Sequence, residues 1–261
     1  MTARGLQVGY RRAILPPIDL EIRRGRMLLV LGRNGSGKTT LMRTLLGLLP
    51  PIAGALDWQA GLRRAFVPQS GAIDAGVPVR AGDVASWGRM RGWSFLWPLP
   101  RRGDRAATIA SLRALEVERL RHQPLRDLSG GQVQRVLFAR MLAGDTDVAV
   151  LDEPTAAMDG AGERAVYKTL RALARDRGIA VVVVTHAVSA ALRTADQVLL
   201  LDPDTSAGGG DARDDAAAVA AGHSPGRILL GPPEQVMHDE TFRSLFGVTA
   251  GFEKLEAADV A

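Results

Sequence analysis

The feature that most constrains this chain is a glycine-rich segment set between a short apolar run and an amphipathic segment. The apolar run is Met27–Leu31, and the glycine-rich segment Gly32–Thr39 (GRNGSGKT) follows it directly. Leucines then recur at helical spacing from Lys38 to Leu48, and two prolines end the pattern. A brief apolar run that stops at glycine is typical of a buried strand. The sequence therefore predicts a strand, a tight loop and a helix in immediate succession.

In this context the glycine-rich segment has the complete pattern of a phosphate-binding loop. Glycines let backbone N–H groups turn toward phosphate oxygens, and the helix N-terminus adds partial positive charge. Lys38 would place its charge on the β- and γ-phosphates, and Thr39 would offer a hydroxyl to Mg²⁺. An ordinary glycine-rich turn is the alternative, which the full pattern and both flanks disfavour. The residues predicted to bind the nucleotide here are Gly32, Arg33, Asn34, Gly35, Ser36, Gly37, Lys38, Thr39 and Thr40.

The loop predicts binding of a nucleoside triphosphate but leaves open a GTPase, a kinase, a helicase or a transporter subunit. Two further apolar runs, Val148–Leu151 and Ala180–Val184, read as buried strands, and Gln197–Leu201 adds another. Between the first two, Glu163–Arg177 has the apolar spacing of a helix, with Gly178 placed as its C-cap. Strand, helix and strand in this order predict an α/β domain with a parallel sheet.

The stretch from Ser70 to Gly144 differs, because it reads as a mainly helical subdomain inserted into the α/β core. Asp104–Arg121, with Asp104 as N-cap, and Gln132–Ala143 are its predicted helices. Further on, Asp202–Gly226 reads as a flexible loop. A strand at Ile228–Leu230 and a helix at Glu234–Phe246 are predicted after it.

A pair of carboxylates, Asp152 and Glu153, follows the apolar run Val148–Leu151. Ligands of parallel α/β sheets bind beyond the carboxyl ends of the strands, so this pair should emerge on the side of the phosphate loop. Asp152 would hold Mg²⁺ and Glu153 would polarise the attacking water. A solvated turn before Pro154 is the alternative for the pair taken alone.

A second local signal is Leu128–Gln132 (LSGGQ). Ser129 and Gln132 form a capping box at a helix start, which does not require the two glycines between them. Gly130 and Gly131 weaken the helix unless something must approach its backbone closely. A helix N-terminus with a serine hydroxyl suits an anionic phosphate, and both interpretations can hold together.

An LSGGQ segment between a phosphate loop and an Asp-Glu strand resembles the signature of the ABC ATPases, and the resemblance covers roughly Leu6–Val248. It implies that Tyr10 stacks on adenine, that Gln69 is the glutamine of the Q-loop, and that His186 is the switch histidine. Ala157-Met158-Asp159 resembles the D-loop, with methionine where leucine is usual, and this places Asp159 at the nucleotide.

The resemblance also implies the fold: a P-loop α/β core with a mainly parallel sheet, an N-terminal antiparallel β subdomain and an inserted helical subdomain at about 70–144. Residues 1–250 would form a single domain, followed by a tail at 251–261. Two copies would pair head to tail, so that Ser129, Gly130, Gly131 and Gln132 of one contact the ATP held by Lys38 of the other. Glu153, His186, Lys38 and Gln69 would be catalytic, and Thr39, Gln69 and Asp152 would bind Mg²⁺.

The implied partners are a second ATPase subunit, membrane permease subunits and a substrate-binding protein, at the cytoplasmic face of the inner membrane. Trp87, Trp93, Phe95 and Trp97 would either dock a permease helix or pack internally. The segment around Val84–Arg105 and the one near Gly231–Val236 resemble importers of metal ions or metal chelates. An exporter subunit and a soluble ABC ATPase outside transport are the alternatives.

Composition excludes several other classes. The chain has no cysteine, which rules out disulfides, thiol catalysis and cysteine-ligated metals. Its net charge of +5 is spread over short arginine pairs with no basic block, which argues against a nucleic-acid partner. The longest apolar run, near Ile179–Val184, is far shorter than the ~20 residues of a membrane span. Other subunits would therefore have to form any transport pathway.

Overall fold

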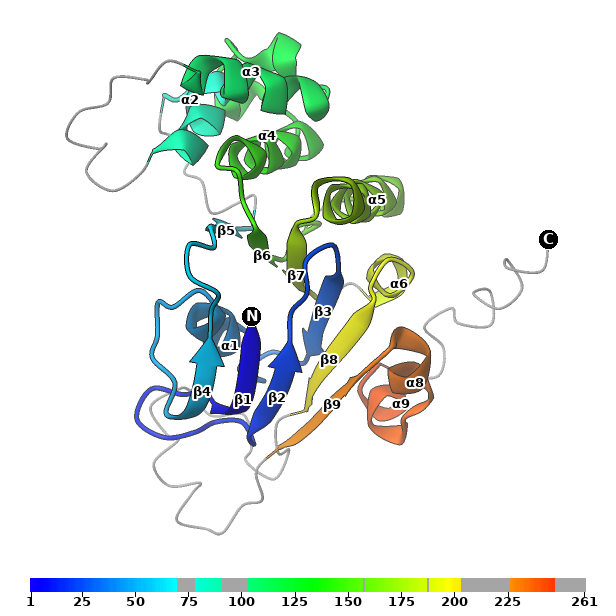
Figure 1. The fold of residues 1–261 in the computed structure, drawn as a ribbon. Coiled ribbons are helices and arrows are strands. Elements are labelled where there is room, and N and C mark those ends of the chain that lie inside the picture. The colour runs from blue at the N-terminus through cyan, green and yellow to red at the C-terminus, as the bar shows by residue number, and fades with distance from the viewer. Residues whose placement is uncertain (70–77, 91–102, 157, 187, 203–225, 247–261) are drawn as a thin grey trace. The chain divides into compact units, whose positions relative to one another are not determined.

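The computed structural model describes residues 1–69, 78–90, 103–156, 158–186, 188–202 and 226–246 (Figure 1). The chain divides into two compact units. The first comprises Met1–Arg23, Met27–Gln59 and Val184–Ala261, and the second comprises Arg24–Arg26 and Ala60–Val183. The predicted loop at Asp202–Gly226 lies almost wholly outside the described residues. Among the described residues, no helix has both the length and the apolarity that crossing a bilayer requires.

An antiparallel sheet begins the first unit, in the order β2 (Ile18–Glu21), β1 (Thr2–Gln7), β4 (Ala53–Asp57) (Figure 1). In register, Thr2 lies opposite Glu21 on one side and Asp57 on the other. Alternation of buried and exposed residues along β2 shows that one face of this sheet packs on the core. The expected N-terminal antiparallel subdomain is confirmed.

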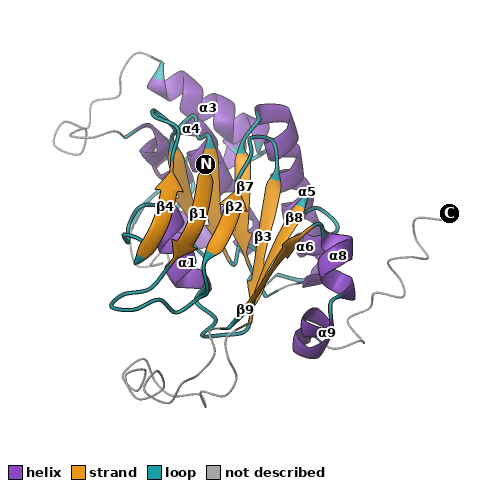
Figure 2. Ribbon diagram, turned by 60° about the horizontal axis from the view of Figure 1, so that its bottom comes forward, coloured by secondary structure: helices purple, strands orange, loops and turns teal. Residues whose placement is uncertain are grey.

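A second set of strands in the first unit is formed by β3 (Met27–Gly32), β8 (Gln197–Asp202) and β9 (Arg227–Gly231) (Figure 2). β8 runs parallel to β3 and antiparallel to β9. All six residues of β3 are buried, as a strand covered on both faces requires. The helices of this unit are α1 (Lys38–Leu45), α6 (Val188–Leu192), α8 (Pro233–His238) and α9 (Glu240–Phe246).

Two helices stand where the sequence predicts one at Glu234–Phe246. Asp239 adopts an extended backbone, with φ −69° and ψ 140°, and ends α8. Its carboxylate accepts a hydrogen bond of 2.8 Å from the backbone N–H of Thr241 and so supports the start of α9. This hydrogen bond is the main cause that lowers the pKa of Asp239 below its usual value.

In the second unit the strands are β5 (Arg64–Val67), β6 (Val148–Asp152) and β7 (Ala180–Val184), in that order. β5 and β6 are parallel, with Val67 opposite Leu151. The helix that connects β6 to β7 is α5 (Gly160–Arg177). Gly178 ends it in the left-handed conformation, with φ 64°, which confirms the predicted C-cap.

The rest of the second unit is helical, as the sequence predicts. Its elements are α2 (Ala81–Ser86), η2 (Trp87–Arg89), α3 (Asp104–Ala114), η4 (Glu118–Leu120), η5 (Leu125–Asp127) and α4 (Gly130–Ala143). α4 packs against both α2 and α3 (Figure 1). Val84, Leu112 and Phe138, one from each of these helices, are almost completely buried.

The helix predicted at Asp104–Arg121 begins at Asp104 as expected, but its predicted end and its predicted N-cap are wrong. Gly103 is its N-cap, in the left-handed conformation, and Asp104 is already the first helical residue. The helix ends at Ala114, because Glu116 adopts a positive φ of 59° that no α-helix can continue through. The carboxylate of Asp104 is used elsewhere, since it accepts a hydrogen bond of 2.9 Å from Nε of Arg89.

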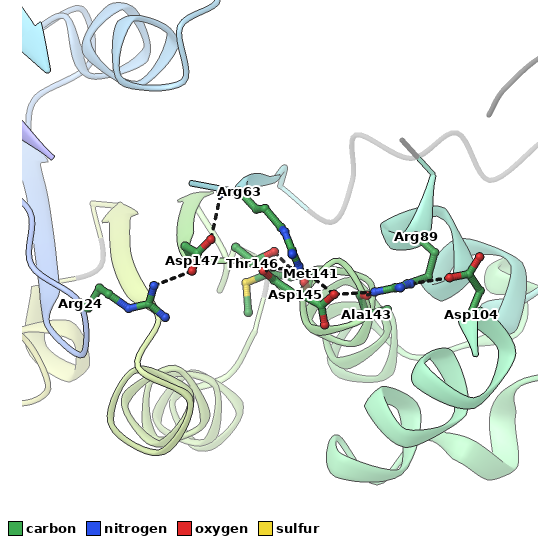
Figure 3. A network of polar contacts seen from close by, with 9 residues as sticks. All are labelled: Arg24, Arg63, Arg89, Asp104, Met141, Ala143, Asp145, Thr146 and Asp147. Atoms are coloured by element: carbon green, nitrogen blue, oxygen red, sulfur yellow. Dashed lines mark hydrogen bonds and ion pairs between the residues drawn. The ribbon is translucent and has the colours of Figure 1, made fainter. Parts of the chain in front are cut away.

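Arg89 belongs to a network of alternating charges that joins the helices to the strands of the second unit (Figure 3). Its Nη1 pairs at 2.6 Å with Asp145, which also pairs at 2.8 Å with Arg63. Asp147, directly before β6, accepts hydrogen bonds from the backbone N–H of Arg63 and from Nη1 of Arg24, at 3.0 and 2.6 Å. The Arg63 N–H is the main cause that lowers the pKa of Asp147, so this stabilisation is present at neutral pH and is lost in acid.

Candidate nucleotide-binding site

The glycine-rich loop has the backbone that its sequence predicts. Gly35 and Gly37 have φ values of 82° and 86°, in the left-handed region that residues with side chains rarely adopt. A Cβ atom on Gly32 would lie 2.5 Å from both the Leu201 carbonyl oxygen and Oγ of Ser36. The loop after β3 is therefore tightly wound, and its shape depends on these glycines.

The helix that follows the loop presents a free N-terminus. The N-cap of α1 is Gly37, so no side chain caps the first N–H groups, and its first turn contains no acidic residue. Arg33, Asn34 and Thr39 are exposed beside it, whereas Ser36 and Thr40 are buried. A helix N-terminus without a cap or an acidic neighbour attracts anions, so the predicted residues fit a phosphate group.

Lys38 is the charged group of the loop. Its side chain is largely buried, and Nζ donates hydrogen bonds to the carbonyl oxygens of Gly32 and Arg33, at 2.8 and 2.7 Å. A buried ammonium group is costly unless its protons have acceptors. The loop carbonyls thus hold the charge in place within the turn that is shaped to receive phosphate.

Tyr10 and His186 lie in the same unit as the loop. Thr185 donates a backbone hydrogen bond of 3.3 Å to Val30 of β3, which places His186 beside the strand that leads into the loop. The His186 side chain is exposed. Tyr10 is 62% exposed, and its hydroxyl accepts a hydrogen bond of 2.6 Å from Nη1 of Arg43. Nothing in the sequence pattern indicated Arg43, which is one of many exposed arginines.

The predicted carboxylates lie at the end of β6 in the second unit. Asp152 is the last residue of the strand, and Glu153 follows it with a positive φ of 46°. Few residues other than glycine adopt such a backbone, and those that do concentrate at functional sites. Gln69 is two residues beyond Val67, the β5 residue opposite Leu151, so it follows the neighbouring strand at the same sheet edge.

The LSGGQ segment forms the start of α4. Ser129 Oγ accepts from the backbone N–H of Gln132 at 3.4 Å, and the Gln132 side chain accepts from the Ser129 N–H at 3.0 Å. The predicted capping box is confirmed. Around Gly130 and Gly131, a Cβ atom would meet no other atom within 4 Å, and neither has a positive φ. Nothing within the described part of the chain requires glycine at these two positions.

Asp159 caps α5, since its Oδ1 accepts a hydrogen bond of 2.7 Å from the backbone N–H of Gly162. This structural role was not foreseen from the sequence. The first unit thus carries the phosphate loop, Tyr10 and His186, and the second carries the carboxylates, Gln69, the LSGGQ segment and Asp159. The individual roles in binding and catalysis remain predictions.

A cavity of about 540 Å³ lies within the second unit, and neither Asp152 nor Glu153 is among its lining residues. It is lined by β5 and the segment before it, by Trp87, Gly88 and Met90, and by the C-terminal half of α4. A Cβ atom on Gly88 would lie 2.0 Å from the Arg140 carbonyl oxygen, so the Trp87 segment packs backbone to backbone on α4. Of the four aromatic residues proposed for partner docking, Trp87 lies in this wall, while Trp93, Phe95 and Trp97 are outside the described residues.

Comparisons with known proteins agree with this geometry. The family described as ABC transporter matches residues 15–156, which is more than half of the chain. The zinc import ATP-binding protein ZnuC of Cereibacter sphaeroides is 36% identical over 192 residues, covering 74% of each protein.

Solved structures show the same fold. A metal-chelate type ABC transporter in an inward-facing conformation has a TM-score of 0.77 and 26% identity, over 94% of this chain and 88% of that one. The dimeric ABC transporter cassette MJ0796 has a TM-score of 0.60 and 25% identity, over 77% of this chain and 93% of that one.

Proposed function

Since the chain belongs to the ABC transporter family and is an ATP-hydrolysing subunit of it, we propose that it drives import of a metal ion or metal chelate through separate membrane subunits. The observation that carries the ATPase part is the uncapped N-terminus of α1 beside the buried Lys38. The cargo rests on likeness, since the zinc import protein of Cereibacter sphaeroides and a metal-chelate type transporter resemble this chain.

In the proposed mechanism the chain's own groups position the triphosphate and the water. Lys38 leaves the carbonyl oxygens of its loop to neutralise charge on the β- and γ-phosphates. Glu153 accepts the proton of the attacking water, and His186 donates a hydrogen bond to the γ-phosphate. Tyr10 stacks on the adenine, and Arg33, Asn34, Ser36 and Thr40 line the phosphate loop.

The donor set also fits Mg²⁺, because hydroxyl, amide and carboxylate oxygens are the ligands that this ion prefers. Thr39, Gln69 and Asp152 would hold it. When bound, the ion neutralises charge that develops between the β- and γ-phosphates. Gln69 would also link the metal and the water to the helical part of the second unit.

We infer that two copies pair head to tail. The open space around Gly130 and Gly131 supports this pairing. No group of the described chain lies close enough to require glycine there, whereas a phosphate group that approaches from a partner would require it. Ser129 and Gln132 flank that space on an exposed helix start, and Asp159, which caps α5, would also lie at the nucleotide of the pair. The MJ0796 cassette, seen as a dimer, is a likeness that supports the same arrangement.

The pairing predicts opposite effects of Gly131→Ala on stability and activity. Alanine lowers the entropy of the unfolded chain and favours the helical backbone that position 131 already adopts, so the free energy of unfolding should rise by about 0.4–1 kcal/mol. A methyl group where the partner's phosphate approaches should lower the ATPase rate by about 10-fold or more. Urea unfolding and steady-state hydrolysis measure the two. A variant that is more stable and fully active would contradict the pairing.

The membrane subunits would dock in the cavity lined by Trp87 and the end of α4. Its wall combines apolar side chains with Arg63, Arg64 and Arg140, and the described residues that line it include no aspartate or glutamate, although Asp145 pairs with Arg63 beside it. An amphipathic helix that carries a carboxylate would complement it. The complex would lie at the cytoplasmic face of the cell membrane, with a substrate-binding protein delivering the cargo on the other side.

Uptake of radioactive zinc tests the proposed cargo. Cells that lack this chain should take up zinc more slowly, and the wild-type chain should restore uptake while Glu153→Gln should not. Glu116→Gln, which alters an exposed carboxylate of the helical region, should restore uptake like the wild type. Zinc uptake that is unchanged by loss of the chain would reject zinc as the cargo.

A further inference from the structure

The exposed ring of Tyr10 is tied to the phosphate-loop helix at one point, and the turn that carries the ring lies against the start of that helix at a second point. The first is Arg43, on α1 five residues beyond Lys38, whose Nη1 donates to the Tyr10 hydroxyl at 2.6 Å. The second is the turn that carries Tyr10, since Ile14 of this turn has Cδ1 3.1 Å from the position of a Cβ on Gly37. Both anchors belong to the first unit, and both join the turn to residues next to the phosphate site.

The backbone of the turn is itself fixed. Ile14 donates a hydrogen bond of 2.9 Å to the Val8 carbonyl oxygen, and Gly9 forms a β-bridge with Ala13. A Cβ atom on Gly9 would lie only 1.7 Å from the Arg12 carbonyl oxygen, so the turn closes on itself there. The direction in which Tyr10 leaves the backbone is therefore set, and its side-chain torsions are the remaining freedom.

We propose that Arg43 is a positioning residue for the nucleotide base, which holds the Tyr10 ring by its hydroxyl so that one face stays ready to stack on adenine. This inference rests on the proposed stacking role of Tyr10. Without the hydrogen bond, a ring that is 62% exposed would rotate freely and would have to be immobilised when the base binds. Arg43 acts through Tyr10 and contacts neither the base nor the phosphates.

The test separates the base from the phosphates by using ADP and inorganic pyrophosphate as probes in calorimetric titrations. Arg43→Met keeps the aliphatic stem and removes the donor, while Tyr10→Phe keeps the ring and removes the acceptor. Each should weaken ADP binding by about 3- to 10-fold, because the Tyr10 side chain would then have to be immobilised when ADP binds. Binding of pyrophosphate, which has no base, should be unchanged. The KM for ATP should rise by the same factor with kcat unchanged, and the double variant should lose no more than either single variant.

Two further variants make the outcome decisive. Arg23→Met removes an exposed arginine, paired with Glu21, from the same unit and should leave all these constants unchanged. Tyr10→Ala should weaken ADP binding more than Tyr10→Phe does. If Tyr10→Ala has no effect, the stacking role itself is wrong. If Tyr10→Ala weakens ADP binding but Arg43→Met does not, the positioning role alone is wrong, and equal loss of ADP and pyrophosphate binding in Arg43→Met would also overturn it.

Discussion

Replacing Glu153 by glutamine should lower the rate of ATP hydrolysis by at least about 100-fold while leaving ATP binding within a few-fold of the wild type. The amide can still orient a water molecule but cannot accept its proton, and loss of a general base typically costs a factor of 10²–10⁴. Because the closed pair would then persist, the variant should elute as a dimer in ATP and as a monomer without it. Phosphate release and size-exclusion light scattering measure the two effects.

Glu116→Gln is a matched control for this variant. Glu116 is also a glutamate with a positive φ, 59°, but its side chain is exposed and pairs with Arg135 at 2.8 Å. Its replacement should leave hydrolysis unchanged and affect stability by less than about 1 kcal/mol. Normal hydrolysis by Glu153→Gln would show that another group accepts the proton.

Replacing Lys38 by methionine should weaken ATP binding by about 10²-fold and abolish measurable turnover. Methionine matches the stem in length but has no charge, and removal of one partner of a hydrogen-bonded charge pair costs 2–5 kcal/mol. Nζ is held by the carbonyl oxygens of Gly32 and Arg33, whereas the side chain of Arg33, the other cation of the described loop, is exposed. Calorimetric titration with ATP measures the affinity.

The matched control is Lys168→Met, which removes a lysine from the exposed face of α5. It changes the net charge by the same amount and should leave ATP affinity and turnover as they are. If Lys38→Met bound ATP as tightly as Lys168→Met, the phosphate contact assigned to Lys38 would be refuted. Circular dichroism should show the same helix content in both variants.

How far the sequence predicted this structure depends on the range of the interactions involved. The loop, the start of α4 and the strands β3, β6, β7, β8 and β9 were predicted correctly because their signals are local: glycines at fixed spacing, a capping pair and apolar runs. The strands β1, β2, β4 and β5 carry no comparable apolar run, and none of them was predicted from its own residues. The end of α3 was missed because Glu116 turns to a positive φ without glycine to mark it. The break between α8 and α9 at Asp239 was missed because an aspartate can lie on the exposed surface of a continuous helix or accept a backbone hydrogen bond at the start of a new one. Its residue type does not distinguish these two positions.

The candidate site shows the same division. The motif residues lie where their spacing predicted, at strand ends and helix starts. The link between Arg43 and Tyr10 could not be read from the sequence, because it joins two exposed side chains 33 positions apart and arginines are numerous in this chain. The charge network around Asp145 and Asp147 could not be predicted either, because it joins arginines that are distant in sequence and resemble the many others in the chain.

The left-handed backbone at Glu153 means that this chain keeps an energetically awkward residue where glycine would fit better. Relief of that strain by glycine would be worth on the order of 1 kcal/mol. Directed evolution for heat resistance alone would therefore favour replacing the very carboxylate on which turnover is proposed to depend. Screens that select for thermal tolerance in this protein thus need to demand ATP hydrolysis at the same time, or they will enrich inert variants.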